Sequence, residues 1–204
     1  MKLYGLAHLL RDRAAPLWNA AEALNGRFFA LPRREKLSRI PGILAARSGD
    51  ALLRAATPDD ARRIAEFFAA QPEESFEFFR PHGFDAAALR RLLGNGGFLA
   101  FLALEGDEIA GYSFMRCFVG GKCFAGWFVG ERFRGRGLVK LQISAMAEIA
   151  RELGLRAFCT VSPRNAASLA AVKSAAETRL VETLDDGRLC LEFLPKEEPR
   201  NPRA

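Results

Sequence analysis

The spacing of apolar and polar positions along the chain changes near residue 50. From Ala51 onward, short apolar runs of strand length alternate with stretches of helical periodicity, and clusters of glycine, proline and aspartate separate them. Strands are predicted at 51–56, 98–104, 109–118, 123–129, 157–161, 179–184 and 189–193. Helices are predicted at 57–70, 85–93, 137–153 and 166–176. The predicted order is therefore β-α-α-β-β-β-α-β-α-β-β, without an internal repeat.

Residues 1–50 follow a different pattern and are interpreted as a basic helical N-terminal extension. Apolar positions recur there at helical spacing after Pro16, a residue that suits the first turn of a helix. The positions of this face are Leu17, Trp18, Ala21, Leu24, Asn25 and Phe28. Pro32 and Pro41 are expected to break the helix. Two interpretations stay open: a helix packed on the main domain, or an arm that contacts a membrane surface or a protein partner.

Charge and composition support a division into this extension, a main domain at 51–194 and a flexible tail at 195–204. The chain has 204 residues, and 50% of them are hydrophobic, which is enough for a substantial core. The net charge is +6, yet the main domain and tail together hold 21 basic and 20 acidic residues. The extension holds nine basic and four acidic residues, so almost all of the excess positive charge belongs to it. The charges of the main domain are balanced and the sequence has no nucleic-acid-binding motif, so no nucleic-acid partner is expected.

The cysteines and histidines indicate the cellular compartment and whether a metal site is expected. The four cysteines, at 117, 123, 159 and 190, lie in or beside apolar runs and form no Cys-x-x-Cys pair. They are typical of reduced thiols in a cytoplasmic protein. His8 and His82 are the only histidines, so no metal centre is expected. No apolar run approaches the roughly 20 residues of a bilayer-spanning helix.

The segment from Trp127 to Lys140 carries the most specific chemistry. A strand leads into a glycine-rich turn, and the turn opens a helix. Gly135 and Gly137 let the backbone approach a ligand closely, and the N–H groups of the first helical turn have no partner within the helix. Arg134 and its basic neighbours add positive charge. This combination predicts a site for a phosphate-bearing ligand.

This turn, the order of elements and the later Asn165-Ala166-Ala167-Ser168 together resemble the GNAT (Gcn5-related N-acetyltransferase) superfamily over residues 51–194. The resemblance implies an α/β (α+β) fold with a mixed, mostly antiparallel central sheet flanked by helices. It also implies transfer of an acetyl group from acetyl-CoA, by direct attack of an amine. The amine could belong to a small molecule, an amino sugar or a protein.

The resemblance also implies which residues bind acetyl-CoA, and it implies no metal ion. The turn and first helical residues would bind the pyrophosphate, the strand before them would pair with the pantetheine amides, and the Val129 N–H would polarise the thioester carbonyl. Asn165 would contact the cofactor arm. The implied cofactor-binding set is Phe128, Val129, Arg134, Gly135, Arg136, Gly137, Leu138, Val139, Lys140 and Asn165.

Catalytic groups are less evident. The tyrosine that often protonates the leaving thiolate in this superfamily is replaced by Val172, and Val139 stands where a smaller residue is usual. Thiols have a pKa near 8.5, so the leaving group needs little acid help at neutral pH. Candidates for the base that deprotonates the amine are His82 and Glu77 in the aromatic loop at 71–84, and also Glu131. The alternative function is a non-catalytic acyl-CoA sensor, which the missing tyrosine favours.

Overall fold

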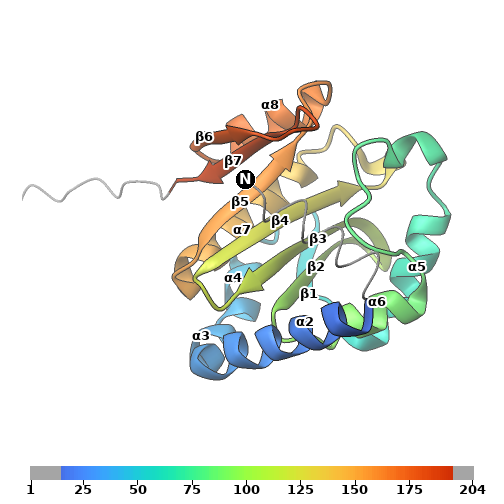
Figure 1. Cartoon of the computed structure of the whole chain (residues 1–204). Helices are drawn as coiled ribbons and strands as arrows, with labels where there is room; N and C mark the ends of the chain where they lie inside the picture. The colour runs from blue at the N-terminus through green and yellow to red at the C-terminus, as the bar shows by residue number, and fades with distance from the viewer. Residues whose placement is uncertain (1–14, 195–204) are drawn as a thin grey trace, which may run out of the picture.

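The computed structural model describes residues 15–194, with side chains from residue 20 onward, and it contains one seven-stranded sheet (Figure 1). The strand order is β1-β2-β3-β4-β5-β7-β6, and every neighbouring pair is antiparallel except the parallel β4 and β5. The strands are β1 (Leu52–Ala55), β2 (Phe98–Glu105), β3 (Glu108–Phe118), β4 (Lys122–Val129), β5 (Arg156–Val161), β6 (Thr178–Thr183) and β7 (Leu189–Phe193). The predicted fold class and element order are confirmed. The tail predicted at 195–204 lies outside the described residues.

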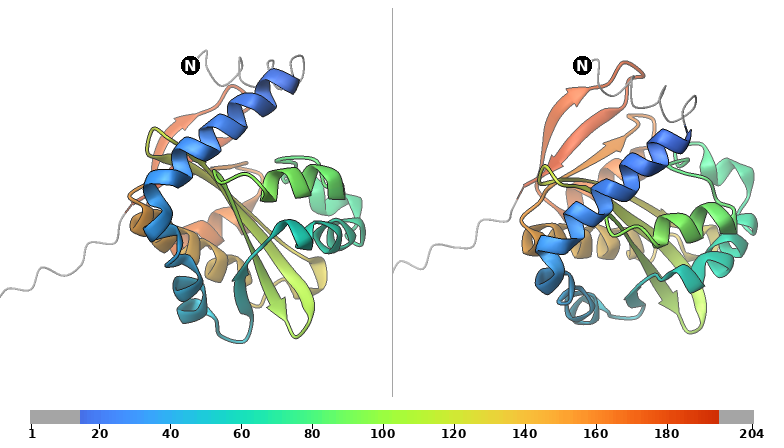
Figure 2. Two further views of the ribbon diagram at one scale, coloured as in Figure 1. Left: turned by 90° about the horizontal axis from the view of Figure 1, so that it is seen from below. Right: turned by 60° about the horizontal axis from the view of Figure 1, so that its bottom comes forward.

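Helices cover both faces of the sheet (Figures 1 and 2). One face packs on α5 (Ala61–Ala69) and α6 (Ala86–Leu93), with Phe68, Leu89 and Tyr112 in its core. The other packs on α4 (Ile40–Arg47), α7 (Leu138–Leu153) and α8 (Ala166–Ala175). No helix within residues 15–194 has the length and hydropathy needed to cross a membrane.

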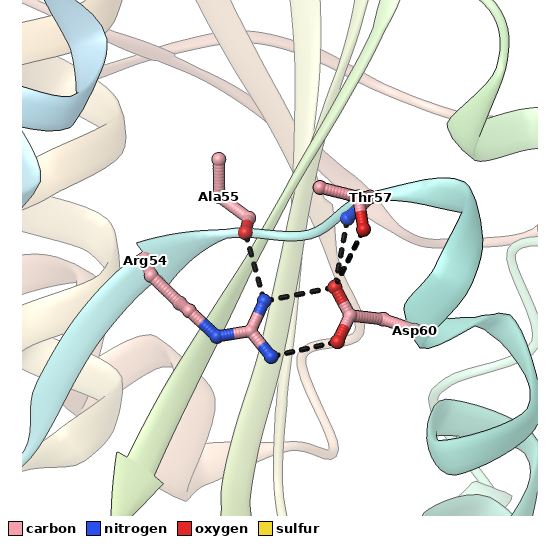
Figure 3. Close-up of polar contacts among 4 residues, drawn as sticks. All are labelled: Arg54, Ala55, Thr57 and Asp60. Carbon is pink, nitrogen blue, oxygen red and sulfur yellow. Dashed lines mark hydrogen bonds and ion pairs between the residues drawn. The ribbon is translucent and has the colours of Figure 1, made fainter.

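A polar cluster fixes where the first strand of the main domain turns into its first helix (Figure 3). The Arg54 guanidinium donates two hydrogen bonds to the Asp60 carboxylate, at 2.8 and 2.6 Å. The same carboxylate accepts the Thr57 N–H at 2.8 Å, the expected capping of a helix start. These bonds hold the pKa of Asp60 at about 2, chiefly through Arg54. Asp85 caps α6, because its Oδ1 accepts the Ala88 N–H at 2.9 Å.

The N-terminal extension is part of the core rather than an arm over its described length. Phe29 of α2 (Ala15–Ala30), together with Ile40 and Leu44 of α4, is at most 5% exposed and belongs to the core of the α7 face. Pro32 and Pro41 break the helix as expected: α2 ends at Ala30, and a new helix begins at each proline, a 3-10 helix at Leu31–Arg33 and α4 at Ile40–Arg47. Each lies in the first turn of a short helix, where a missing N–H costs nothing.

Among the described side chains of the predicted α2 face, Asn25 alone lies against the domain. Leu24 and Phe28 are 56% and 65% exposed and Ala21 is exposed, whereas Gly26 and Phe29, outside that face, point toward the domain. The side chain of Trp18 lies outside the described residues. The apolar pattern therefore identified the helix but assigned the wrong side of it to the core.

On the packed side of α2, Gly26 allows a close approach to the domain beside the buried Phe29. A Cβ on Gly26 would stand 2.0 Å from Asn95 Oδ1 and 3.1 Å from the Gly97 nitrogen. Asn95 Nδ2 donates to the Glu22 carbonyl at 3.1 Å, and Asn25 Nδ2 donates to the Cys117 carbonyl at 2.8 Å. The turn at 94–97, between α6 and β2, is thus the surface that α2 crosses.

We expect Gly26→Ala to destabilise the protein by about 1–3 kcal/mol, because the new methyl group forces α2 away from this turn. Gly42→Ala in α4 is the matched control, since a Cβ there meets nothing within 4 Å. Alanine is the better helix former, so the control should be neutral or gain up to about 1 kcal/mol. Urea unfolding of both variants measures the difference. Equal stabilities would contradict the glycine crossing.

Candidate functional site

The site is built where two parallel strands stop pairing. β4 and β5 are matched only from Lys122 with Arg156 to Phe124 with Phe158. Beyond Phe124, β4 continues to Val129 with β3 on one side and no strand on the other. The sheet therefore has, in its middle, a stretch of strand edge whose backbone groups are not used by the ladder.

The register shows which groups those are. The Gly130 N–H donates to the Ala110 carbonyl at 2.9 Å, so these two residues form a hydrogen-bonded pair. Hydrogen-bonded pairs alternate along an antiparallel ladder, and Phe128 with Tyr112 is the next one. The N–H and C=O groups of Trp127 and Val129 consequently point away from β3, toward the side where β5 has diverged. They can pair with the amides of an extended ligand.

The glycine-rich turn follows immediately. After a short 3-10 turn at Glu131–Phe133, Gly135 and Gly137 have φ angles of +77° and +79°, in the left-handed region that favours glycine. Gly137 is the N-cap of α7 and has no side chain to cap it. The N–H groups of residues 138–140 have no acceptor within the helix, since the Leu141 N–H is the first to bond back, to the Gly137 carbonyl.

The basic side chains of this turn do not all face the helix start. Arg134 donates to the Ser75 hydroxyl at 2.8 Å, which is a neutral partner. Arg136 instead pairs with Glu105 at 2.7 Å and lies near the Phe133 ring. Its guanidinium is therefore not positioned for the predicted contact with a phosphate. Lys140 is exposed and has no acidic partner within residues 15–194.

The face of β4 beside α5 is lined by aromatic rings. The Phe128 ring stacks on Phe76 at 5.4 Å between centroids, and it lies 5.2 Å from Phe79 and 5.5 Å from Phe68. This packing places the loop at 71–84 against the unpaired end of the strand. The Phe128 side chain therefore supports the loop, and its strand neighbour Val129 presents the backbone.

His82 is held on both ring nitrogens. Nδ1 lies 2.9 Å from the Gly83 carbonyl, which can only accept, so Nδ1 carries the proton. Nε2, 3.1 Å from the Tyr112 hydroxyl, must then accept that O–H. Burial is the main reason why the pKa of His82 falls to about 4, with a smaller contribution from Arg116. A weak base with an occupied lone pair is a poor proton acceptor, and this geometry argues against the predicted base role.

Glu77 and Asn165 are also engaged. The Glu77 carboxylate pairs with Arg164, whose guanidinium lies 5.7 Å from the Phe78 ring. This ion pair links the loop at 71–84 to the loop before α8. Asn165 caps α8, since its Oδ1 accepts the Ser168 N–H at 3.0 Å. Its oxygen thus has a structural partner, whatever its amide nitrogen binds.

Two glutamines contribute in ways that sequence reasoning missed. Gln71 Oε1 accepts the Glu131 N–H at 3.0 Å and Nε2 donates to the Phe67 carbonyl at 3.0 Å, so it ties the turn to α5. Gln142 of α7 is buried against β4, with its Nε2 3.5 Å from the Phe128 carbonyl. Neither belongs to a motif. Within residues 15–194, no three His, Cys, Asp or Glu side chains form a metal-binding group.

Comparison with known proteins identifies the family. A family model described as the acetyltransferase (GNAT) domain matches residues 50–175, more than half of the chain. The chain belongs to the GNAT acetyltransferase family. No curated protein matches it. The match begins at β1 and ends within α8, so it includes the unpaired end of β4 and the glycine-rich turn.

Solved GNAT structures share the fold. The GNAT domain of S. lividans PAT has a TM-score of 0.62 and 23% identity, over 70% of this chain and 89% of that one. The ribosomal-protein-S5-alanine acetyltransferase from Vibrio fischeri has a TM-score of 0.61 and 12% identity, over 74% and 97%. Aminoglycoside acetyltransferase AAC(6')-Ib with coenzyme A and kanamycin has 0.57 and 16%, over 71% and 94%. These identities establish a common fold only.

The bonding of His82 makes a measurable prediction about its charge. In a His8→Gln background, where His82 is the sole histidine, NMR should show the neutral Nδ1–H form from pH 8 down to about pH 5.5. The unfolded chain binds this proton near pH 6.5 and the folded protein only near pH 4. Stability should therefore decline as pH falls through that window.

Removal of the hydroxyl by Tyr112→Phe leaves Nε2 without its donor and should cost about 1–3 kcal/mol. Phe114→Leu, on the same strand but without a hydrogen bond to the ring, is the comparison for general loss of packing, and it should leave the tautomer unchanged. Titration of His82 near pH 6.5 in the folded protein would overturn the assignment.

Proposed function

We propose that the chain is an N-acetyltransferase that transfers the acetyl group of acetyl-CoA to an amine. One observation carries this proposal: the backbone edge of β4 that β5 leaves unpaired runs directly into the unpartnered first turn of α7. An extended pantetheine chain with amides fits the first feature, and a pyrophosphate fits the second. The acetyl-CoA complex of AAC(6')-Ib, a protein of the same fold, supports the choice of ligand.

The turn fits a pyrophosphate in this proposal. The N–H groups of Leu138, Val139 and Lys140 would bind its oxygens, and the dipole of α7 favours negative charge there. A Cβ at Gly135 or Gly137 would meet nothing within 4 Å, so the backbone is open to a close ligand. Lys140 would add its charge directly. Arg134 would add its own by exchanging the Ser75 hydroxyl for a phosphate oxygen.

The end of β4 would supply the chemistry's main electrostatic contribution. When bound, acetyl-CoA supplies the acetyl group as a thioester, whose sulfur leaves as the amine nitrogen bonds to the carbonyl carbon. The Val129 N–H points to the unpaired side and would hydrogen-bond the carbonyl oxygen as it gains charge. One such donor typically contributes 10²–10³ in rate.

Proton transfer is proposed to need no dedicated side chain. Val172 is fully buried in the core, so the position of the missing tyrosine offers no acid. His82 is neutral and bonded, and Glu77 is paired with Arg164. We therefore expect the reaction to use the fraction of acceptor that is already neutral, and the proton that this amine releases as the amide forms would pass to the departing thiolate or to water. Its rate should rise with pH until the pKa of the acceptor amine is reached.

The same observations favour a second candidate, an acyl-CoA sensor without turnover. Release of free thiol from acetyl-CoA distinguishes the two when tested against a panel of amines, including kanamycin and a peptide with N-terminal alanine. Thiol release that depends on an amine supports the transferase. Tight binding of acetyl-CoA without thiol release from any amine would favour the sensor.

The cofactor assignment can be tested by calorimetry. Arg134→Ala combined with Lys140→Ala should weaken coenzyme A binding by at least about 2 kcal/mol, roughly 30-fold, because charge-assisted hydrogen bonds contribute about 1.5–3 kcal/mol each. Arg132→Ala is the control: it removes one charge from the same turn, but that charge is already paired with Glu108 and stacked on Phe133. Equal losses in both variants would mean a general charge effect, and unchanged binding in the double variant would refute the site.

A further inference from the structure

A row of large apolar side chains lies on the side of α2 that faces away from the domain and continues onto the 3-10 turn after it, Leu31–Arg33. Leu24, Phe28 and Leu31 are 56%, 65% and 70% exposed. Their spacing of four and three residues places them on one side of the helical path, over about 10 Å. We call these three residues the α2 outer face. In Figure 2, α2 crosses the outside of the molecule.

The charges around this face are positive. Arg27, Arg34 and Lys36 are exposed and have no acidic partner within residues 15–194. Glu22 and Glu35 are the acidic residues of the described segment 15–37, and each is paired: Glu22 with Arg116 at 3.0 Å and Glu35 with Arg39 at 2.6 Å. The uncompensated charge beside the outer face is therefore cationic.

We propose that the α2 outer face docks on an anionic lipid surface. A helix that lies in the membrane interface needs leucine and phenylalanine on one side and basic residues beside them, and both are present. A second copy of the chain is a poorer occupant, because the arginines and lysine of two copies would be brought together. Nucleic acid would satisfy the cations but would leave the two leucines without a suitable contact.

Docking through this face leaves the proposed acetyl-CoA site accessible. Asn25 of α2 bonds to Val119, in the turn that precedes β4. The glycine-rich turn follows the opposite end of the same strand, and seven residue steps of a strand span about 23 Å. Membrane association would thus hold the protein by one end of β4 and present the other to soluble ligands.

The test is flotation of the full chain with vesicles, with the bound fraction measured. The wild type should bind vesicles of mixed phosphatidylglycerol and phosphatidylcholine and not vesicles of phosphatidylcholine alone. Leu24→Gln with Phe28→Gln should lower the partition coefficient at least about tenfold. Arg27→Gln with Arg34→Gln should weaken it, and added salt should weaken the wild type in the same way.

Leu180→Gln with Val181→Gln is the matched control, because these β6 side chains are also exposed, at 55% and 46%. In the sheet, β4, β5 and β7 separate β6 from β3, the strand to which Asn25 of α2 bonds. It should bind vesicles as the wild type does, and all variants should retain their melting temperature and coenzyme A affinity. No binding to anionic vesicles, or equal losses in both apolar pairs, would overturn the proposal. A dimer in sedimentation that Leu24→Gln with Phe28→Gln dissociates, without vesicle binding, would assign the face to a second copy instead.

Discussion

The parallel contact between β4 and β5 is three residue pairs long, and the arrangement of the site depends on this shortness. A full-length pairing would have consumed the backbone groups of Trp127 and Val129. Because β5 diverges instead, the strand reaches the glycine-rich turn with one edge unused. The turn then presents a second set of unused N–H groups at the start of α7. Two sets of unpaired backbone groups, one on β4 and one at the start of α7, therefore follow each other along the chain.

The unpaired end of β4 is covered by packed side chains on both of its faces. Aromatic rings from α5 and the loop at 71–84 pack against Phe128 on one face. On the other, α7 contributes Gln142 and the apolar residues around Ile143. His82 contributes to this support, since its Nε2 accepts the Tyr112 O–H of β3 and its Nδ1 donates to the Gly83 carbonyl within the loop. The end of β4 is therefore held by side chains packed on its two faces, and its unpaired edge carries the backbone groups proposed to bind the ligand.

Much of this could be predicted from local patterns. Strand and helix order followed from hydrophobic periodicity, and the glycine-rich turn proposed to bind a phosphate from glycine and arginine spacing. The rest depends on partners distant in sequence. From the sequence, His82 is a loop residue that could titrate. Its hydrogen bond to Tyr112, thirty positions away, is visible only in the structure. The same holds for Arg136 and its pairing with Glu105. The packing side of α2 was missed because a backbone contact through Gly26 has no apolar signature.

The short β4–β5 contact also divides the sheet. β1 to β4 form one ladder, while β5, β7 and β6 form another, in which Glu192 accepts from Arg156 and Arg179 at 2.6 Å each. Few backbone hydrogen bonds connect the two ladders, so α7, which packs on both, connects them mainly through apolar contacts. In terms of local unfolding, the β5–β7–β6 unit can open without breaking the longer ladder. Amide hydrogen exchange would then be slowest in β2 and β3, the strands farthest from that junction with neighbours on both sides.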